Sequence, residues 1–239
     1  MTTGDVVILP VTEKVISKTT VNTIKKFNHT DPSRMYGRAP VELLDNIYMG
    51  DLAKNSLLDY LQANACCPFI DYDEVRTDDF HNADPGWDFK AGQEQIKTEV
   101  KSSIPTHSES RQAIIDKRDI KVTASHDKGN SWIEPADLES DIHVQVYFYA
   151  RPYKKGYSDF AALHQDLNAD NQALHRIINS KKYDQPLFFG WNTKQSIIQF
   201  ARTLQPDTWS FGKTSRVYRR CPIKEAMTLL QLVEYFNTH

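Results

Sequence analysis

The segment from residue 141 to residue 150, DIHVQVYFYA, restricts the possible folds of this chain more than any other. Most of its residues are β-branched or aromatic, and these residue types favour β-strands. Strands composed largely of apolar residues are covered on both faces, so we expect this one to lie in the interior of a sheet. Covering both faces requires a sizeable core, which a chain of 239 residues is long enough to build.

The elements expected around this strand predict the α/β or the α+β class. Residues 39–63 place apolar side chains close to helical spacing, and we expect Gly50 to divide them into a short and a longer helix. Residues 110–122 fit a helix or a strand. Further strands are expected within 66–75, 87–90, 96–102, 186–191 and 215–223, and further helices within 157–183, 192–202 (capped by Asn192 or Thr193) and 224–239. This mixed order predicts a sheet flanked by helices.

Residues 1–40 are polar and weakly periodic apart from the run from Val6 to Leu9, so we expect an N-terminal arm with one strand or short helix. Residues 41–239 are expected to form a single domain. The first residues have no basic segment followed by a long apolar run, so we expect no secretory signal, and no stretch approaches the ~18 apolar residues that span a bilayer. We therefore expect a cytoplasmic protein with no membrane partner, in which Cys66, Cys67 and Cys221 are reduced.

The net charge and the incomplete motifs of the sequence argue against several function classes. The formal net charge of −2 provides no overall field for nucleic acid, so such a partner would have to meet a local basic face. FGKTS at 211–215 imitates the end of a phosphate-binding loop, but Asp207 stands where that motif needs a glycine. DLNADN at 166–171 begins like a calcium loop but lacks the turn glycine and the closing glutamate.

Charged residues in the strands expected at 87–90 and 96–102 form the strongest candidate site. Side chains two residues apart share one face of a strand, so Glu99 and Lys101 lie together while Val100 points into the core. Asp88 lies on the other strand of the same hairpin. Two carboxylates and the backbone carbonyl of Val100 are oxygen ligands that Mg²⁺ prefers, and an ammonium beside them can orient or deprotonate a water or stabilise phosphoryl charge. The alternative is a surface strand whose charges are simply solvated.

Asp88, followed eleven positions later by Glu99-Val100-Lys101, resembles the PD-(D/E)XK nuclease superfamily, which includes many restriction endonucleases. The expected order over roughly 48–150 is also similar: a leading helix, a short strand, an acidic loop, a hairpin carrying the motif, a helix and a buried strand. The segments FFGWNTKQSI and YRRCPIKEAMTLLQLVEYF are similar to C-terminal segments of bacterial members.

This resemblance implies an α/β restriction endonuclease-like core, with a central mixed β-sheet flanked by α-helices. It implies Mg²⁺-dependent hydrolysis of phosphodiester bonds in double-stranded DNA, in the manner of a type II restriction enzyme acting as a homodimer and leaving 5′-phosphates. Asp88, Glu99 and Val100 would hold Mg²⁺, with Mn²⁺ as the alternative cation, and Lys101 would act on the attacking water. The alternatives are a repair, phage or defence nuclease that recognises DNA structure, and a catalytically inactive nucleic-acid-binding member.

The chain departs from the superfamily pattern at two places. Trp87, rather than a proline, precedes Asp88, and Pro85 is displaced. Lys54 stands where the leading helix of many members supplies another carboxylate. Asp51 or Asp45 could substitute for that carboxylate, and Asp71 or Asp84 could replace Asp88 if the strand register differs from the expected one.

A DNA-cleaving enzyme also needs contacts to phosphate groups, and basic clusters provide candidates. Ser102 and Ser103, directly after Lys101, could also contact phosphate, although serines at a strand end more often cap the local backbone. Each basic cluster could equally be a solvated positive face. The basic candidates are Arg151, Lys154 and Lys155; Lys181 and Lys182; and Lys213, Arg216, Arg219 and Arg220.

Overall fold

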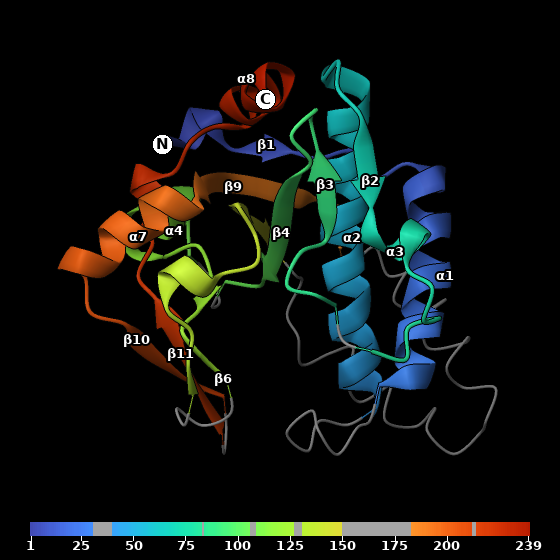
Figure 1. Cartoon of the computed structure of the whole chain (residues 1–239), viewed down its shortest axis with the longest axis horizontal. Helices are drawn as coiled ribbons and strands as arrows, with labels where there is room; N and C mark the ends of the chain where they lie inside the picture. Colours follow the sequence, from blue (N-terminus) through green and yellow to red (C-terminus); the bar gives the residue numbers. More distant parts are fainter. Residues whose placement is uncertain (31–39, 83, 106–108, 127–130, 150–182, 212–213) are drawn as a thin grey trace.

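The computed structural model describes residues 1–30, 40–82, 84–105, 109–126, 131–149, 183–211 and 214–239 (Figure 1). A six-stranded sheet forms its centre, in the order β1 (Val7–Ile8), β9 (Pro186–Thr193), β8 (Ile142–Phe148), β4 (Ile96–Ser103), β3 (Phe89–Ala91) and β2 (Phe69–Asp71). β4 and β8 run parallel, whereas the other neighbouring pairs are antiparallel. The expected α/β class with a mixed sheet flanked by helices is therefore confirmed.

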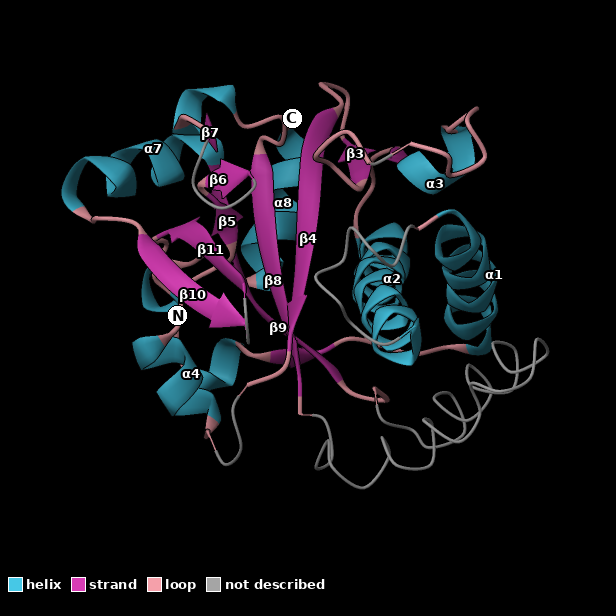
Figure 2. Cartoon of the chain, turned by 90° about the horizontal axis from the view of Figure 1, so that it is seen from below, coloured by secondary structure: helices cyan, strands magenta, loops and turns pink. Residues whose placement is uncertain are grey.

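The strand expected at 141–150 lies inside the sheet, between β9 and β4, and every residue of β8 is buried. One apolar cluster joins the sheet to α2 (Pro40–Asn64) and α8 (Leu229–Thr238). A second joins it to α4 (Arg111–Lys117), α7 (Lys194–Thr203) and β5 (Val122–Thr123). Figure 2 shows α1 (Glu13–His29) and α2 on one side of β4 and β8, with α4 and α7 on the other.

The expected break at Gly50 is wrong, because α2 runs without interruption from Pro40 to Asn64. A glycine inside a helix costs about 1 kcal/mol relative to alanine. The helix buries large side chains on both sides of this position, including Tyr48 and Leu52, at 3% and 1% exposure. Their burial outweighs the local preference of one glycine.

The first 30 residues contribute more regular structure than the expected arm with one strand or short helix. β1 pairs with β9 at the sheet edge, and α1 is a 17-residue helix packed along α2. The side chain of Thr12 caps α1 by accepting a hydrogen bond from Val15 N at 3.2 Å. The buried positions of α1 include Thr19, Asn22 and Thr23, so the face turned to the protein is largely polar and gives a weak hydrophobic period.

The remaining elements follow the expected order with small shifts. Residues 110–122 contain both α4 and the first residue of β5, so the helix and strand interpretations each hold for part of the segment. Thr193 caps α7, as expected, by accepting from Ser196 N at 3.1 Å. β10 (Asp207–Phe211), β11 (Thr214–Arg219) and β5 form a second, three-stranded sheet, and β6 (Ser125–His126) pairs with β7 (Ser131–Trp132).

Short elements complete the described part of the chain. α3 (Tyr72–Val75) follows β2, and the 3-10 turns are η1 (Thr3–Asp5), η3 (Pro135–Asp137) and η5 (Ile223–Glu225). The closing helix α8 begins at Leu229 rather than Lys224, because Thr228 caps it by accepting from Gln231 N at 3.3 Å. Almost all of the helix expected at 157–183 lies outside the described residues. None of the described helices is long and apolar enough to cross a bilayer.

Replacing Leu57 with alanine should lower the free energy of unfolding by about 2–5 kcal/mol, because the change leaves a cavity in the core. Leu57 has 0% exposure and belongs to the apolar cluster that joins α2 to the sheet. Leu230→Ala is the matched control, since Leu230 is 68% exposed on α8 and its loss should change stability by less than about 0.5 kcal/mol. Urea unfolding measures both, and equal losses would contradict this packing.

Candidate functional site

Asp88 lies beside Glu99 and is bonded to the backbone of β4 on both sides of it, at Thr98 and at Val100. Its N–H donates to the carbonyl of Thr98 at 2.8 Å, and its Oδ2 accepts from Val100 N at 2.6 Å. The carbonyl of Asp88 accepts from Tyr72 N at 3.0 Å. These three bonds hold Asp88 at the start of β3, so the hairpin does bring its carboxylate next to the strand that carries Glu99.

Glu99 and Lys101 lie on the face of β4 opposite to the buried residues Thr98 and Val100. Lys101 Nζ contacts Glu99 Oε1, and His143 Nδ1 lies 3.0 Å from Glu99 Oε2. The Glu99 and Lys101 side chains are 18% and 31% exposed, respectively. The pair is therefore held by the fold but still reachable from solvent.

The electrostatic environment keeps both members of this pair charged. Burial alone would raise the pKa of Glu99, but Lys101 and then His143 outweigh it and lower that pKa to about 2. Burial would lower the pKa of Lys101, but the Glu99 carboxylate outweighs it and raises that pKa. An ammonium beside an ionised carboxylate is the result.

Asp88 is in a different electrostatic state from Glu99. Burial raises the pKa of Asp88 to about 7, and the hydrogen bond from Val100 N and the charge of Lys54 offset this only in part. Near neutral pH the carboxyl group therefore retains a proton for part of the time, because the surrounding positive charge is too small to ionise it fully. A divalent cation could take the place of that proton.

The donor set fits a Mg²⁺ ion that keeps several waters. Mg²⁺ is commonly bound through one or two carboxylates, with water or phosphate oxygens at its other positions. Asp88 and Glu99 supply two hard oxygen donors, and the raised pKa of Asp88 marks a deficit of positive charge. Groups of three or more His, Cys, Asp or Glu side chains arranged to hold a metal do not occur among the described residues. The role of the Val100 carbonyl stays a prediction.

Lys54 belongs to a separate cluster of charges between α1, α2 and α3. Its side chain is 3% exposed, and its Nζ contacts Asp73 and lies 2.9 Å from Asp71 Oδ1. Lys26 Nζ lies 2.7 Å from Asp51 Oδ1 and 3.0 Å from Asp73 Oδ2. Although burial opposes it, Lys54 and Lys26 together lower the pKa of Asp73. Three carboxylates here are already matched by lysines.

The alternative aspartates all have partners other than Glu99 in this structure. Asp51 and Asp71 belong to the lysine cluster. Asp45 Oδ2 accepts from the Tyr183 hydroxyl at 2.8 Å, and Asp84 Oδ1 lies 2.8 Å from Arg76 Nη1. Among these candidates Asp88 has its carboxylate anchored to the β4 backbone beside Glu99, which favours it as the partner of Glu99.

The expected phosphate-binding residues are scattered. Ser103 is buried and its Oγ accepts from Gln145 Nε2 at 3.0 Å, while Ser102 Oγ faces Gly50 of α2. Arg219 Nη2 donates to the carbonyl of Ile133 at 2.9 Å. The roles predicted for these residues stay predictions. Arg220 Nε lies 2.6 Å from Asp119 Oδ2, and Arg216 lies on β11. The remaining candidates lie outside the described residues: Arg151, Lys154, Lys155, Lys181, Lys182 and Lys213.

Sequence reasoning missed a row of polar residues that continues the site across the sheet. His143 on β8 is the register partner of Glu99 and, on its other side, of Asn192 on β9. Gln145 is the partner of Lys101, and its Nε2 donates to the Lys101 carbonyl at 3.0 Å. The signal was present in DIHVQV, where a histidine and a glutamine alternate with apolar residues.

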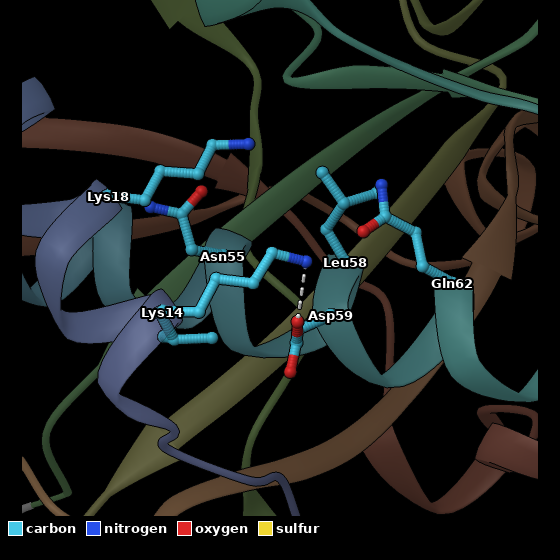
Figure 3. Close-up of a pocket in the computed structure, with 7 residues that line it drawn as sticks. Lys14, Lys18, Asn55, Leu58, Asp59 and Gln62 are labelled. Atoms are coloured by element: carbon cyan, nitrogen blue, oxygen red, sulfur yellow. Dashed lines mark hydrogen bonds and ion pairs between the residues drawn. The ribbon is translucent and has the colours of Figure 1, made fainter.

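A small surface pocket lies elsewhere, between α1 and α2 (Figure 3). Lys14 Nζ and Asp59 Oδ1 lie 3.2 Å apart at this pocket. It contains none of the residues of the candidate site. Its lining residues are Lys14, Val15, Lys18, Asn55, Leu58, Asp59 and Gln62.

Comparisons of the chain with protein-family models, with curated proteins and with solved structures found no match. The functional interpretation therefore depends on the geometry of the site itself. That geometry brings two carboxylates, of Asp88 and Glu99, and the ammonium of Lys101 together at a face of β4 that solvent can reach.

The stability of the metal-free protein should fall as the pH rises from about 4 to 7, and Asp88→Asn should reduce that dependence. The folded-state pKa of Asp88 is about 7, against 3.8 for an unperturbed aspartate, so the folded protein binds more protons than the unfolded chain in this window. The contribution is present below about pH 4 and is lost by about pH 7, with a slope of up to about 1.4 kcal/mol per pH unit. Unfolding titrations measure it, and equal slopes in both proteins would contradict the shift.

Lys54→Met should cost about 3–5 kcal/mol of unfolding free energy, because it leaves buried carboxylates without their shared cation. Methionine keeps an unbranched apolar stem in the same place. Lys14→Met is the control: Lys14 is 72% exposed and pairs with Asp59 at 3.2 Å, so its loss should cost about 0–1 kcal/mol. Thermal and urea unfolding of the two variants provide the comparison, and similar small losses would mean that the Lys54 cluster contributes little.

Proposed function

We propose that this protein is a Mg²⁺-dependent endonuclease that hydrolyses phosphodiester bonds in double-stranded DNA, with sequence-specific cleavage of the type II restriction kind. The observation that carries the proposal is the convergence of Asp88, Glu99 and Lys101. Asp88 is anchored to the backbone of Val100 at 2.6 Å, and Lys101 contacts the Glu99 carboxylate. An isolated pair of solvated surface charges would not include a half-buried hairpin aspartate with a raised pKa.

The arrangement of elements also supports this proposal. α2, β2, β3, β4, α4 and β8 occur in the chain in the order expected for the restriction endonuclease-like core. The short α3 lies between β2 and β3, and β5, β6, β7 and η3 lie between α4 and β8. β2, β3, β4 and β8 are consecutive in the sheet, with Asp88 at the start of β3 and Glu99 and Lys101 on β4. The motif and the topology are independent observations, so their agreement carries more weight than either alone.

Each site residue has a distinct task in the proposed reaction. Asp88 and Glu99 would hold the cation, which supplies electrostatic stabilisation of phosphoryl charge and makes a bound water more acidic. Lys101 contacts Glu99 Oε1 and is partly exposed, so its ammonium can reach a water or a phosphate oxygen beside that carboxylate. Its raised pKa favours positioning of the water and stabilisation of negative charge over proton abstraction.

The mode of DNA recognition belongs to the proposal as well. Two-fold symmetric duplex sites are generally met by two-fold symmetric proteins, so the expected active form is a homodimer. Arg219 and Arg220 already contact the Ile133 carbonyl and Asp119, so a phosphate would have to share or replace those partners. A nuclease that recognises DNA structure, and an inactive DNA-binding member of the fold, are the other outcomes to distinguish.

Purified protein should cut plasmid and phage DNA when Mg²⁺ is present and not when EDTA is present. Lys101→Ala and Glu99→Ala should each reduce the rate by about two to four orders of magnitude, because each removes a group acting on the reacting atoms. Lys97→Ala is the matched control, since Lys97 is on the same strand but lies 3.5 Å from Glu139 instead of Glu99. Its rate should remain within about twofold of wild type.

The pattern of products separates the alternatives. Discrete fragments of constant size indicate sequence-specific cleavage, whereas a smear indicates a nuclease without sequence specificity. Binding of DNA without any metal-dependent cutting would support the inactive alternative and overturn the enzymatic proposal. Sedimentation with and without DNA tests the homodimer.

A further inference from the structure

His143 flanks Glu99 on the side away from Asp88. The order of strands is β8, β4, β3, and the register pairs His143 directly with Glu99 across the parallel strands. The His143 side chain has 1% exposure, and its Nδ1 lies 3.0 Å from Glu99 Oε2. We propose that His143 is a positioning residue that holds Oε2 of Glu99 and so aims Oε1 at the cation; this inference rests on the function proposed above.

The chemistry of the pair determines the direction of the interaction. An ionised carboxylate can only accept hydrogen bonds, so Nδ1 must carry a proton to contact Glu99 favourably. Nε2, on the other side of the ring, lies 3.3 Å from the Ser140 hydroxyl. A hydroxyl can donate or accept, so Ser140 suits the ring in either protonation state of Nε2.

The ring is placed rigidly enough to orient another side chain. His143 lies in an interior strand whose residues are all buried, and Ser140 has 1% exposure. The neighbour of His143 in β9 is Asn192, which is also buried, with 2% exposure. His143 is thus fixed by its burial in β8 and by the Ser140 contact, whereas the Glu99 side chain is 18% exposed and has more freedom to adjust.

Glu99 needs such an anchor because its carboxylate is otherwise held at one oxygen. Lys101 contacts Oε1, and the terminal torsion of a glutamate is broad, so the group could rotate about that single contact. His143 Nδ1, 3.0 Å from Oε2, would restrict that rotation and leave Oε1 facing Lys101 and the solvent-reachable side. Groups that orient the ligands of a metal in this way affect its affinity by about 10–100-fold.

Stability alone does not account for this histidine. Ile142, Val144 and Val146 of the same strand are apolar and completely buried. Replacing a buried polar pair with apolar residues of similar volume is often neutral or stabilising, so packing would be served as well by two aliphatic residues. A histidine facing Glu99 therefore fits a role in orienting the carboxylate.

Three substitutions separate orientation from packing. In His143→Asn the amide nitrogen can take the place of Nδ1 and retain the contact to Glu99. In His143→Gln the amide nitrogen lies near the place of Nε2, so that contact is lost although a polar side chain remains. His143→Leu removes both nitrogens at similar volume. Thr98→Val is the control, because Thr98 is equally buried in β4 but faces the opposite side from Glu99.

Mn²⁺ binding to the metal-stripped protein, measured by calorimetry without DNA, is the first readout. We expect His143→Gln and His143→Leu to weaken binding by about 10–100-fold, with His143→Asn within about threefold of wild type. Thr98→Val should bind as wild type does. In cleavage assays His143→Gln and His143→Leu should raise the Mg²⁺ concentration for half-maximal rate about tenfold and leave KM for DNA unchanged.

A double-mutant cycle tests the contact without metal or activity. Glu99→Gln, His143→Leu and the double variant should be non-additive by about tenfold in the unfolding equilibrium constant, because the two side chains are in contact. If the wild type binds Mn²⁺ and cuts DNA but His143→Asn and His143→Gln weaken Mn²⁺ binding equally, the positioning role of His143 is overturned. The nuclease proposal then stands. A wild type that neither binds Mn²⁺ nor cuts DNA overturns the nuclease proposal together with it, whatever the cycle reports.

Discussion

The parallel pairing of β4 with β8 is the constraint on which the rest of the structure depends. Parallel neighbours cannot be joined by a tight turn, so the chain between them must cross from one end of the sheet to the other. That crossing contains α4 and β5, which cover the face of the sheet opposite to α2. The same pairing brings His143 into register with Glu99 and Gln145 into register with Lys101. The parallel pairing of β4 with β8 therefore has two results. It leads the chain over the second face of the sheet, and it brings the polar residues of the site into one row.

The protein has two groups of charged side chains with different balances of positive and negative charge. Around Lys54 and Lys26 the carboxylates of Asp71, Asp73 and Asp51 are met by ammonium groups within hydrogen-bonding distance. Around Asp88 the positive charge is insufficient, and the pKa of its carboxyl group is raised. The first group contributes to the fold, whereas the second contains the residues of the proposed cation site. Burial acts in both groups, since it also raises the pKa of Asp51 although Lys26 and Lys54 lie beside that carboxylate.

Local patterns predicted most strands and the motif, because period-two alternation and charge spacing are short-range signals. The alternation around Val100 is sufficient to predict that Glu99 and Lys101 share one face of their strand. α1 was underestimated because its inner face carries Thr19, Asn22 and Thr23, which pair with other polar groups and leave only a weak hydrophobic period. The uninterrupted α2 and the contact of His143 with Glu99 depend on packing between distant segments, which no local pattern reports.

The bond from Tyr72 N to the Asp88 carbonyl links the two charge groups mechanically. Tyr72 lies between Asp71 and Asp73 in the chain, and both of those carboxylates are held by lysines of α1 and α2. A displacement of α1 would therefore pull on Tyr72 and, through one hydrogen bond, on the backbone of Asp88. The stiffness of the site originates in part in a cluster that need not touch any substrate.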